Sequence, residues 1–424
     1  MISRRNLLWT TIATAAFRNE TLDLVSKLIG KVDPSAETAA QDEEFWYQIQ
    51  QAFSLDPNVV NFNNGGCCPS PRIVEDALRR QLELSNQAPS YYMWRDLEPE
   101  IESVRRRLAA TFGCDAEELA ITRNASESLE TCLCGLPLSA GDEVLTSTLD
   151  YPRMITTIQQ RERREGVKLV QVVVPPVPNH PHEITEAFEK GLTPKTKMIL
   201  VSHVVFMNGQ INPVREICEL GSRHGIPVIV DGAHAFAQFP FSKSGLGCEY
   251  YGTSLHKWIM APIGTGFLFV QRDKIDGLWS LMASGETQSK DIRKYEEIGT
   301  HPAANHNAIG EALTFHEMIG VERKAARLRY LRKRWTDRLR ELSKVEFHTN
   351  LSPEHSCGLT TVQIEGIKSG DLASWLLSKH GIFVTTIANP QFEGIRVTPN
   401  VYTTVQEIDR FGDAMVKAAR EGIA

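Results

Sequence analysis

Short apolar runs alternate with amphipathic stretches through the middle of the chain. The apolar runs, rich in aliphatic and β-branched residues, cover 119–122, 142–145, 167–174, 196–203 and 226–230. In the segments between them, and earlier at 71–85 and 99–112, apolar residues recur at helical spacing. Strands that alternate with helices in this way form a parallel sheet that is covered on both faces. The pattern therefore predicts an α/β domain.

The last third of the chain has a different order of predicted helices and strands. After an apolar strand at 266–270, helical patterns cover 303–319 and 321–342. Short strands at 359–365, 381–386 and 395–398 then alternate with helices at 369–380 and 404–420. We expect an N-terminal signal and linker over 1–44, a large domain over 45–320, and a small α+β domain over 321–424.

Composition narrows the possible partners. The chain has 424 residues, 46 of them basic and 52 acidic, for a net charge of −6. This balance gives no reason to expect a nucleic-acid partner. The eight cysteines fit no zinc spacing, so we expect no metal.

The first residues resemble an export signal. Arg4 and Arg5 precede a short apolar stretch that ends in Ala13-Thr14-Ala15, as in a twin-arginine signal peptide. We expect the protein to be exported to the periplasm. A helical extension on a cytoplasmic protein is the alternative. The stretch is too short to cross a membrane.

Two residues after buried segments suggest chemistry. Asp231 ends the run 226–230, and open α/β sheets bind ligands at the carboxyl ends of their strands. Lys257 follows in Ser254-Leu255-His256-Lys257, before a turn rich in proline and glycine. Lysine becomes a nucleophile when burial or nearby cations lower its pKa, and it can then form a Schiff base. Taken singly, each residue could equally be a solvated charge at the edge of the core.

Two turns could line the same site. The segment 123–128, Arg-Asn-Ala-Ser-Glu-Ser, joins a strand to a helix, and the free N–H groups of a helix start bind phosphate. Ser126 could also be an ordinary N-cap. The loop Asn63-Asn64-Gly65-Gly66 has strong turn chemistry and suits a site lining or a plain turn.

Taken together and in order, these motifs resemble one family. They are NFNNGGCCPSP, TRNASESLE, SHVVFMNGQINPV, VIVDGAH, SLHKW with APIGTGFL, EIGTHP and IRVTPNVYTT, spread over residues 45–420. The chain is similar to the class V aminotransferases, and within them to isopenicillin N epimerases. The resemblance implies pyridoxal 5′-phosphate (PLP) as cofactor. It also implies fold type I of the PLP-dependent transferases, a mostly parallel seven-stranded sheet with a smaller C-terminal domain.

The resemblance assigns roles around the cofactor ring. Lys257 matches the Schiff-base lysine, and Asp231 matches the partner of the pyridine nitrogen. Tyr151 matches the side chain that stacks over the ring. Asn208 and His234 match positions near the phenolic oxygen of the ring.

The remaining matches concern the phosphate and the substrate. Those expected at the phosphate are Ala125, Ser126, Ser254 and His256, together with Thr300 from the neighbouring subunit of a homodimer. Arg396 matches the arginine that holds the substrate α-carboxylate. We expect Asn64 at the substrate as well.

The sequence leaves the reaction open. We expect epimerase-like or aminotransferase chemistry at the α-carbon of an amino acid or an amino-acid-bearing compound. A β-eliminating C–S lyase is the alternative, and a non-catalytic binding protein that keeps the fold is a second. The loop 385–394 before Arg396 holds no cysteine, which disfavours desulfuration by a cysteine nucleophile there.

Overall fold

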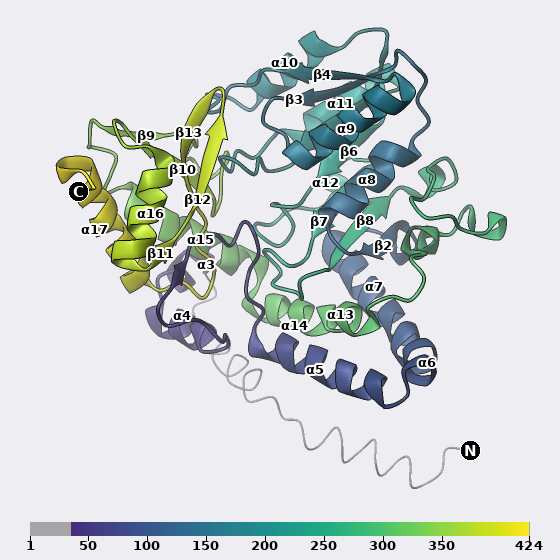
Figure 1. Cartoon of the computed structure of the whole chain (residues 1–424), viewed down its shortest axis with the longest axis horizontal. Helices are drawn as coiled ribbons and strands as arrows, with labels where there is room; N and C mark the ends of the chain where they lie inside the picture. The colour runs from purple at the N-terminus through teal and green to yellow at the C-terminus, as the bar shows by residue number, and fades with distance from the viewer. Residues whose placement is uncertain (1–34, 424) are drawn as a thin grey trace.

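The computed structural model describes residues 35–423, so the predicted signal at 1–34 lies outside the described part. Its largest unit is a seven-stranded sheet with strand order β2-β8-β7-β6-β5-β3-β4 (Figure 1). Only β8 runs antiparallel to its neighbours, so the predicted, mostly parallel α/β sheet is confirmed. The strands are β2 Leu119–Thr122, β3 Glu143–Ser147, β4 Lys168–Val172, β5 Thr196–Ser202, β6 Val228–Asp231, β7 Tyr250–Ser254 and β8 Gly266–Val270.

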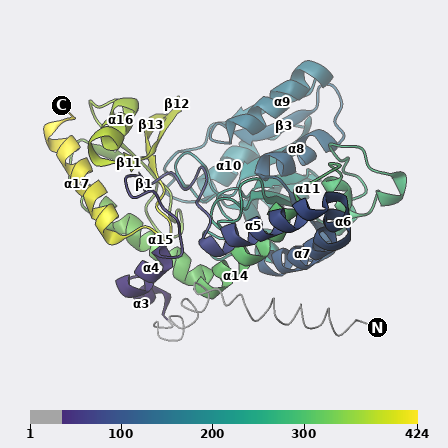
Figure 2. The same ribbon diagram turned by 60° about the horizontal axis from the view of Figure 1, so that its bottom comes forward.

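Successive residues of the central strands enter different cores. Val228 and Val230 belong to the core on one face of β6, and Ile229 belongs to the core on the other face. This alternation follows from the two-residue period of a strand. Helices therefore cover both faces, with α8 and α9 on one side and α5 and α7 on the opposite side (Figure 2). The helices of this domain are α5 Arg72–Gln87, α7 Glu98–Phe112, α8 Ala125–Gly135, α9 Pro152–Glu165, α10 His182–Gly191, α11 Val214–His224, α13 Ala303–Asn307 and α14 Ile309–Ile319.

The C-terminal part forms a second unit beside the first (Figure 1). Its antiparallel sheet has the order β12-β13-β10-β9. Its elements are α15 Val321–Thr336, β9 Val345–Phe347, β10 Thr360–Ile364, α16 Ser369–His380, β11 Ile382–Phe383, β12 Thr385–Asn389, β13 Phe392–Val397 and α17 Val405–Glu421. The helix predicted over 321–342 thus ends six residues early, and the strand predicted over 381–386 is divided between β11 and β12.

The N-terminal segment joins this second unit. Strand β1 Val60–Asn61 pairs in parallel with β11, and Val60 and Phe62 are buried in the C-terminal core. Helices α3 Ala36–Ala39 and α4 Glu43–Gln50 precede it, and α3 packs on α15. The chain therefore passes from the small unit into the large one through the loop at residues 63–70.

Strand β7 was not predicted, because it contains a glycine and no aliphatic side chain. The glycine is required by packing. A Cβ at Gly252 would lie 2.8 Å from the Ser128 Cβ, so only glycine lets α8 pack this closely on the sheet. This close approach places the start of α8 beside the residues that follow β7.

Candidate active site

Asp231 is the last residue of β6 and lies in the middle of the sheet. Its side chain is 7% exposed, and its carboxylate accepts a hydrogen bond from the Ala233 amide at 2.9 Å. Burial raises the pKa of Asp231 to about 6, although this hydrogen bond and the nearby Lys257 oppose the shift. A buried carboxylate with so few partners suits a cationic ligand group.

Lys257 lies beside this carboxylate, in the loop after β7. Its Nζ is 3.1 Å from the His234 Nε2. Burial lowers the pKa of Lys257 to about 8, even though Asp231 acts in the opposite direction. Burial and the Lys257 charge also hold the pKa of His234 well below its usual range, so a neutral His234 shares a hydrogen bond with the amine. A share of the Lys257 amine is therefore unprotonated near neutral pH.

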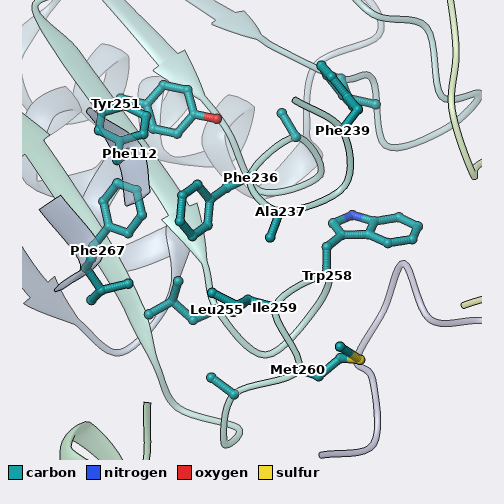
Figure 3. Close-up of a cluster of buried hydrophobic side chains, with 14 of the residues drawn as sticks. Phe112, Phe236, Ala237, Phe239, Tyr251, Leu255, Trp258, Ile259, Met260 and Phe267 are labelled. Atoms are coloured by element: carbon teal, nitrogen blue, oxygen red, sulfur yellow. The ribbon is translucent and has the colours of Figure 1, made fainter. Parts of the chain in front are cut away.

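The backbone on both sides of Lys257 is fixed. The Cys68 amide donates to the His256 carbonyl at 2.9 Å, and the buried Lys324 amine of α15 donates to the Trp258 carbonyl. The loop is anchored in the core by its own buried side chains, Leu255, Trp258, Ile259 and Met260 (Figure 3). The amine is thus carried by a segment that the core holds rigidly.

Two strained residues belong to these same loops. Ala237 and Met260 have φ angles of 62°, which L residues other than glycine rarely adopt. Each stands three positions after a side chain of the site, His234 and Lys257 respectively, and Figure 3 shows both in one apolar cluster. Strain of this kind persists only where the surrounding packing enforces it, and it often marks functional loops.

The start of α8 faces the Lys257 loop. The Ala125 amide donates to the Ser254 Oγ at 3.0 Å, and the Asn124 side chain caps the Glu127 amide at 2.9 Å. The amide and hydroxyl of Ser126 make no hydrogen bond within residues 35–423. A free amide at a helix N-terminus is an anion site, so this turn fits a phosphate.

Arg396 of β13 approaches from the small domain. Its two terminal nitrogens donate to the Phe206 carbonyl and to the Asn63 Oδ1, each at 2.8 Å. Its Nε is buried without a partner, and the side chain is 6% exposed. It forms no ion pair with any described carboxylate, which leaves its charge open to an anionic ligand.

Gly65 connects the two halves of the site. A Cβ at this position would lie 3.3 Å from the His234 Cε1 and 3.4 Å from the Arg396 Cζ. His234 and Arg396 therefore both border the turn at 63–66. A side chain at position 65 would crowd them.

Tyr151 lies at the edge of the same space. It precedes α9, is 40% exposed, and packs edge-on against Phe206 with ring centroids 5.2 Å apart. The Phe206 carbonyl accepts from Arg396, so Tyr151 lies near that guanidinium. Sequence reasoning missed Phe206, which stands two positions before the expected Asn208.

Two of the expected residues form hydrogen bonds within the protein itself. Asn208 is fully buried, and its amide bonds the Pro176 carbonyl and the Gln210 amide. The buried Asn64 amide bonds the Thr398 carbonyl and the Tyr402 hydroxyl, and the structure brings its neighbour Asn63 to Arg396 instead.

Thr300 is exposed in the loop before α13. Within residues 35–423 it shares no hydrogen bond with the other candidates.

The chain is similar in sequence and in fold to known proteins. The profile of the class-V aminotransferases matches residues 60–411. The chain belongs to the class-V aminotransferase family. Isopenicillin N epimerase of Streptomyces clavuligerus is 30% identical over 391 residues, which cover 87% of this chain and 97% of the relative. A probable cysteine desulfurase of Halalkalibacterium halodurans is 28% identical over 337 residues, 74% of this chain and 80% of the relative.

Solved structures agree on the fold. An apo cysteine desulfurase from Thermococcus onnurineus matches with a TM-score of 0.76 at 21% identity, over 88% of this chain and 97% of that one. A cystine C–S lyase bound to cysteine persulfide matches with a TM-score of 0.76 at 23% identity, over 84% and 97%. The expected PLP fold type I is confirmed.

This class V enzyme is PLP-dependent, and its residues fit the cofactor. Asp231 would meet the pyridine nitrogen, Lys257 the aldehyde, and the Ser126 amide the phosphate. The His234 Nδ1 and His256 Nδ1 are buried without partners, as polar atoms beside a ligand are. In the described chain no cluster of histidine, cysteine or acidic side chains could hold a metal, and no helix is long and apolar enough to cross a membrane.

Proposed function

We propose that this enzyme acts at the α-carbon of an amino acid or an amino-acid-bearing compound, by epimerase-like or aminotransferase chemistry. One observation carries the proposal. The Lys257 amine lies 3.1 Å from the His234 Nε2, and His234 and Arg396 both approach Gly65. Arg396 has no carboxylate partner in the described chain, and its charge helps to lower the pKa of Lys257. A base and an unpaired guanidinium in one site suit an α-amino acid.

Each side chain has a defined task. Bound PLP supplies an electron sink for the bond that breaks at the α-carbon. Arg396 orients the substrate through its carboxylate, and its two fixed bonds to Phe206 and Asn63 hold the guanidinium plane. Lys257 takes up and returns the α-proton, which its lowered pKa permits near neutral pH. Asp231 keeps a positive charge at the far end of the ring.

Epimerisation requires proton return from the opposite face. Besides Lys257, His234 and His256, the side chains of Cys67 and Tyr151 carry protons near the site. Cys67 is exposed two positions after Gly65, and the Tyr151 ring packs on Phe206, whose carbonyl accepts from Arg396. The epimerase relatives favour this outcome over transamination.

A C–S lyase is the second candidate, supported by the desulfurase relatives. In this chain, however, the turn between β12 and β13 is tied to the large domain by Gln391. Its side chain bonds Thr148 and the Val174 carbonyl, and the hairpin holds no cysteine.

The test is incubation of the PLP-loaded protein with an amino-acid panel in D₂O. Deuterium at the α-carbon with inversion supports epimerisation, and a keto acid with a PLP-to-amine spectral change supports transamination. Release of a keto acid together with sulfide from cysteine, or with cysteine persulfide from cystine, would indicate the lyase. If Lys257→Ala matches the wild type and no substrate exchanges its α-proton, the protein is a non-catalytic binder and the proposal fails.

We further propose a homodimer in which Thr300 serves the neighbouring subunit. Its exposure in a loop without contacts to its own site supports this. Mixing Lys257→Ala with Thr300→Ala chains should then restore activity at one of the two sites of each mixed dimer, whereas no gain in activity on mixing would refute it.

Export is a separate proposal that rests on Arg4 and Arg5. Replacing both with lysine should retain the protein in the cytoplasm. An unchanged distribution would contradict it.

A further inference from the structure

A second cavity lies outside the active site. It measures about 1080 Å³ and is enclosed by α3, by α15 and by the loop 349–353. None of the candidate site residues lines it. A cavity of this size matches the upper range of small-molecule sites.

One face of α15 supplies its positive charge. Arg329, Arg332, Lys333 and Thr336 line the cavity and follow one another at helical spacing, so they share a face. Lys333 is neutralised by Asp337. Arg329 and Arg332 form no ion pair with any described carboxylate, although Glu37 and Glu322 border the same cavity.

Arg332 shows most clearly that a charge is uncompensated. It is 4% exposed, yet its partners are neutral, the Ser356 hydroxyl and the Leu351 carbonyl at 2.7 Å. Burial, with Arg329 and Arg340 nearby, lowers the pKa of Arg332 to about 10. A buried guanidinium without a counter-ion is costly, and the cost falls when an anion binds.

Arg329 has the open donor. One terminal nitrogen donates to the Pro353 carbonyl at 3.1 Å, and its Nε is buried without a partner. The cavity is also lined by apolar side chains, among them Ala36, Ala40 and Val177. A ligand that fits must therefore carry an anionic head on an apolar body.

We propose that this cavity binds a small organic anion, a carboxylate or phosphate group on an apolar scaffold, with the head on Arg329 and Arg332. The site can influence catalysis through α15. Lys324, on the same helix, donates to the Trp258 carbonyl, next to Lys257. Binding here and turnover at Lys257 thus share one rigid element.

The test uses the full-length, PLP-loaded protein, so that the phosphate turn at Ser126 is already filled. Calorimetric titration with 3-phenylpropionate and with phenyl phosphate distinguishes the two headgroups, and neutral 3-phenylpropanamide is the control ligand. At least one anion should bind saturably at one site per chain without changing the cofactor spectrum. The tighter of the two identifies the head.

Variants decide whether the arginines are responsible. Arg329→Gln should weaken the anion at least tenfold, because a charge-assisted hydrogen bond is lost. Arg215→Gln, an exposed arginine on α11 paired with Glu219, should bind as the wild type does. The proposal fails if neither anion binds, if the amide binds equally well, or if Arg329→Gln leaves the affinity unchanged. Occupation of the cavity by the chain's own residues 1–34 would give the first of these results.

Discussion

Lys257 and Arg396 lie close enough for the charge of Arg396 to lower the pKa of Lys257, but the chain holds them by different means. Asp231 ends β6, and Lys257 follows the neighbouring strand β7. The side chains of Leu255, Trp258, Ile259 and Met260, which flank Lys257 in sequence, belong to the large apolar core (Figure 3). Arg396 is held by two hydrogen bonds, to Asn63 and Phe206, from segments far away in sequence. The cofactor side is therefore preorganised by packing, whereas the substrate side is assembled from three separate pieces.

The substrate side of the site can therefore change more easily than the cofactor side. Changing a loop that only meets Arg396 alters the substrate space without disturbing the sheet. Changing the Lys257 loop disturbs the core and the strained Met260 as well. The substrate side is the place where family members can diverge in reaction and specificity.

The largest expected effect comes from the cofactor side. Lys257→Ala should lower kcat by roughly 10²–10⁴-fold or more, since it removes the acid–base group at the α-carbon. Because the side chain lies above the core, the unfolding transition should change little. Steady-state rates and thermal unfolding measure both. Near-normal turnover would show that another group carries the proton.

Arg396→Gln should come next. Loss of a charge-assisted contact worth about 1.5–3 kcal/mol predicts a fall of roughly tenfold to a hundredfold in kcat/KM, mostly through KM. Arg396→Lys is the matched variant, because it keeps the charge and loses the planar fork. If kcat falls and KM is unchanged, Arg396 does not bind the substrate carboxylate.

The pH dependence of stability tests Asp231. Its pKa is raised from 3.8 to about 6, so the folded apoprotein binds the proton more tightly than the unfolded chain does. This contribution is full below about pH 4 and is lost as the pH rises through 6, up to about 3 kcal/mol. Asp231→Asn should flatten the free energy of unfolding over this window. Identical pH profiles for the two proteins would contradict the assignment.

A smaller effect is expected at Lys324, a positioning residue. Lys324→Met removes the hydrogen bond to the Trp258 carbonyl and should shift the pKa of the cofactor absorption band, with a severalfold loss of kcat. Lys333→Met, exposed on the same helix, is the control. An unchanged spectral pKa together with lower stability would mean that Lys324 only supports the fold.

Much of this architecture could be predicted from the sequence. The parts that were missed have physical reasons. Apolar runs and Asp231 at a strand end were enough for the sheet and its binding edge. Strand β7 escaped because Gly252 and its polar neighbours carry no strand pattern; the packing on Ser128 required the glycine. A residue pattern cannot show which member of a motif contacts Arg396. The sequence therefore pointed to Asn64 and Asn208, whereas Arg396 bonds Asn63 and Phe206. Lys324 contacts a residue 66 positions away, and nothing local indicates it.

We propose above all that Lys257 holds the cofactor. Borohydride reduction of the PLP-loaded protein, followed by peptide mass spectrometry, tests it directly because reduction fixes PLP on the lysine that carries it. We expect the phosphopyridoxyl mass on the peptide that contains Lys257, and we expect it to be absent in Lys257→Ala. A label on another lysine, such as the buried Lys324, or no label on a protein that remains active, would contradict it.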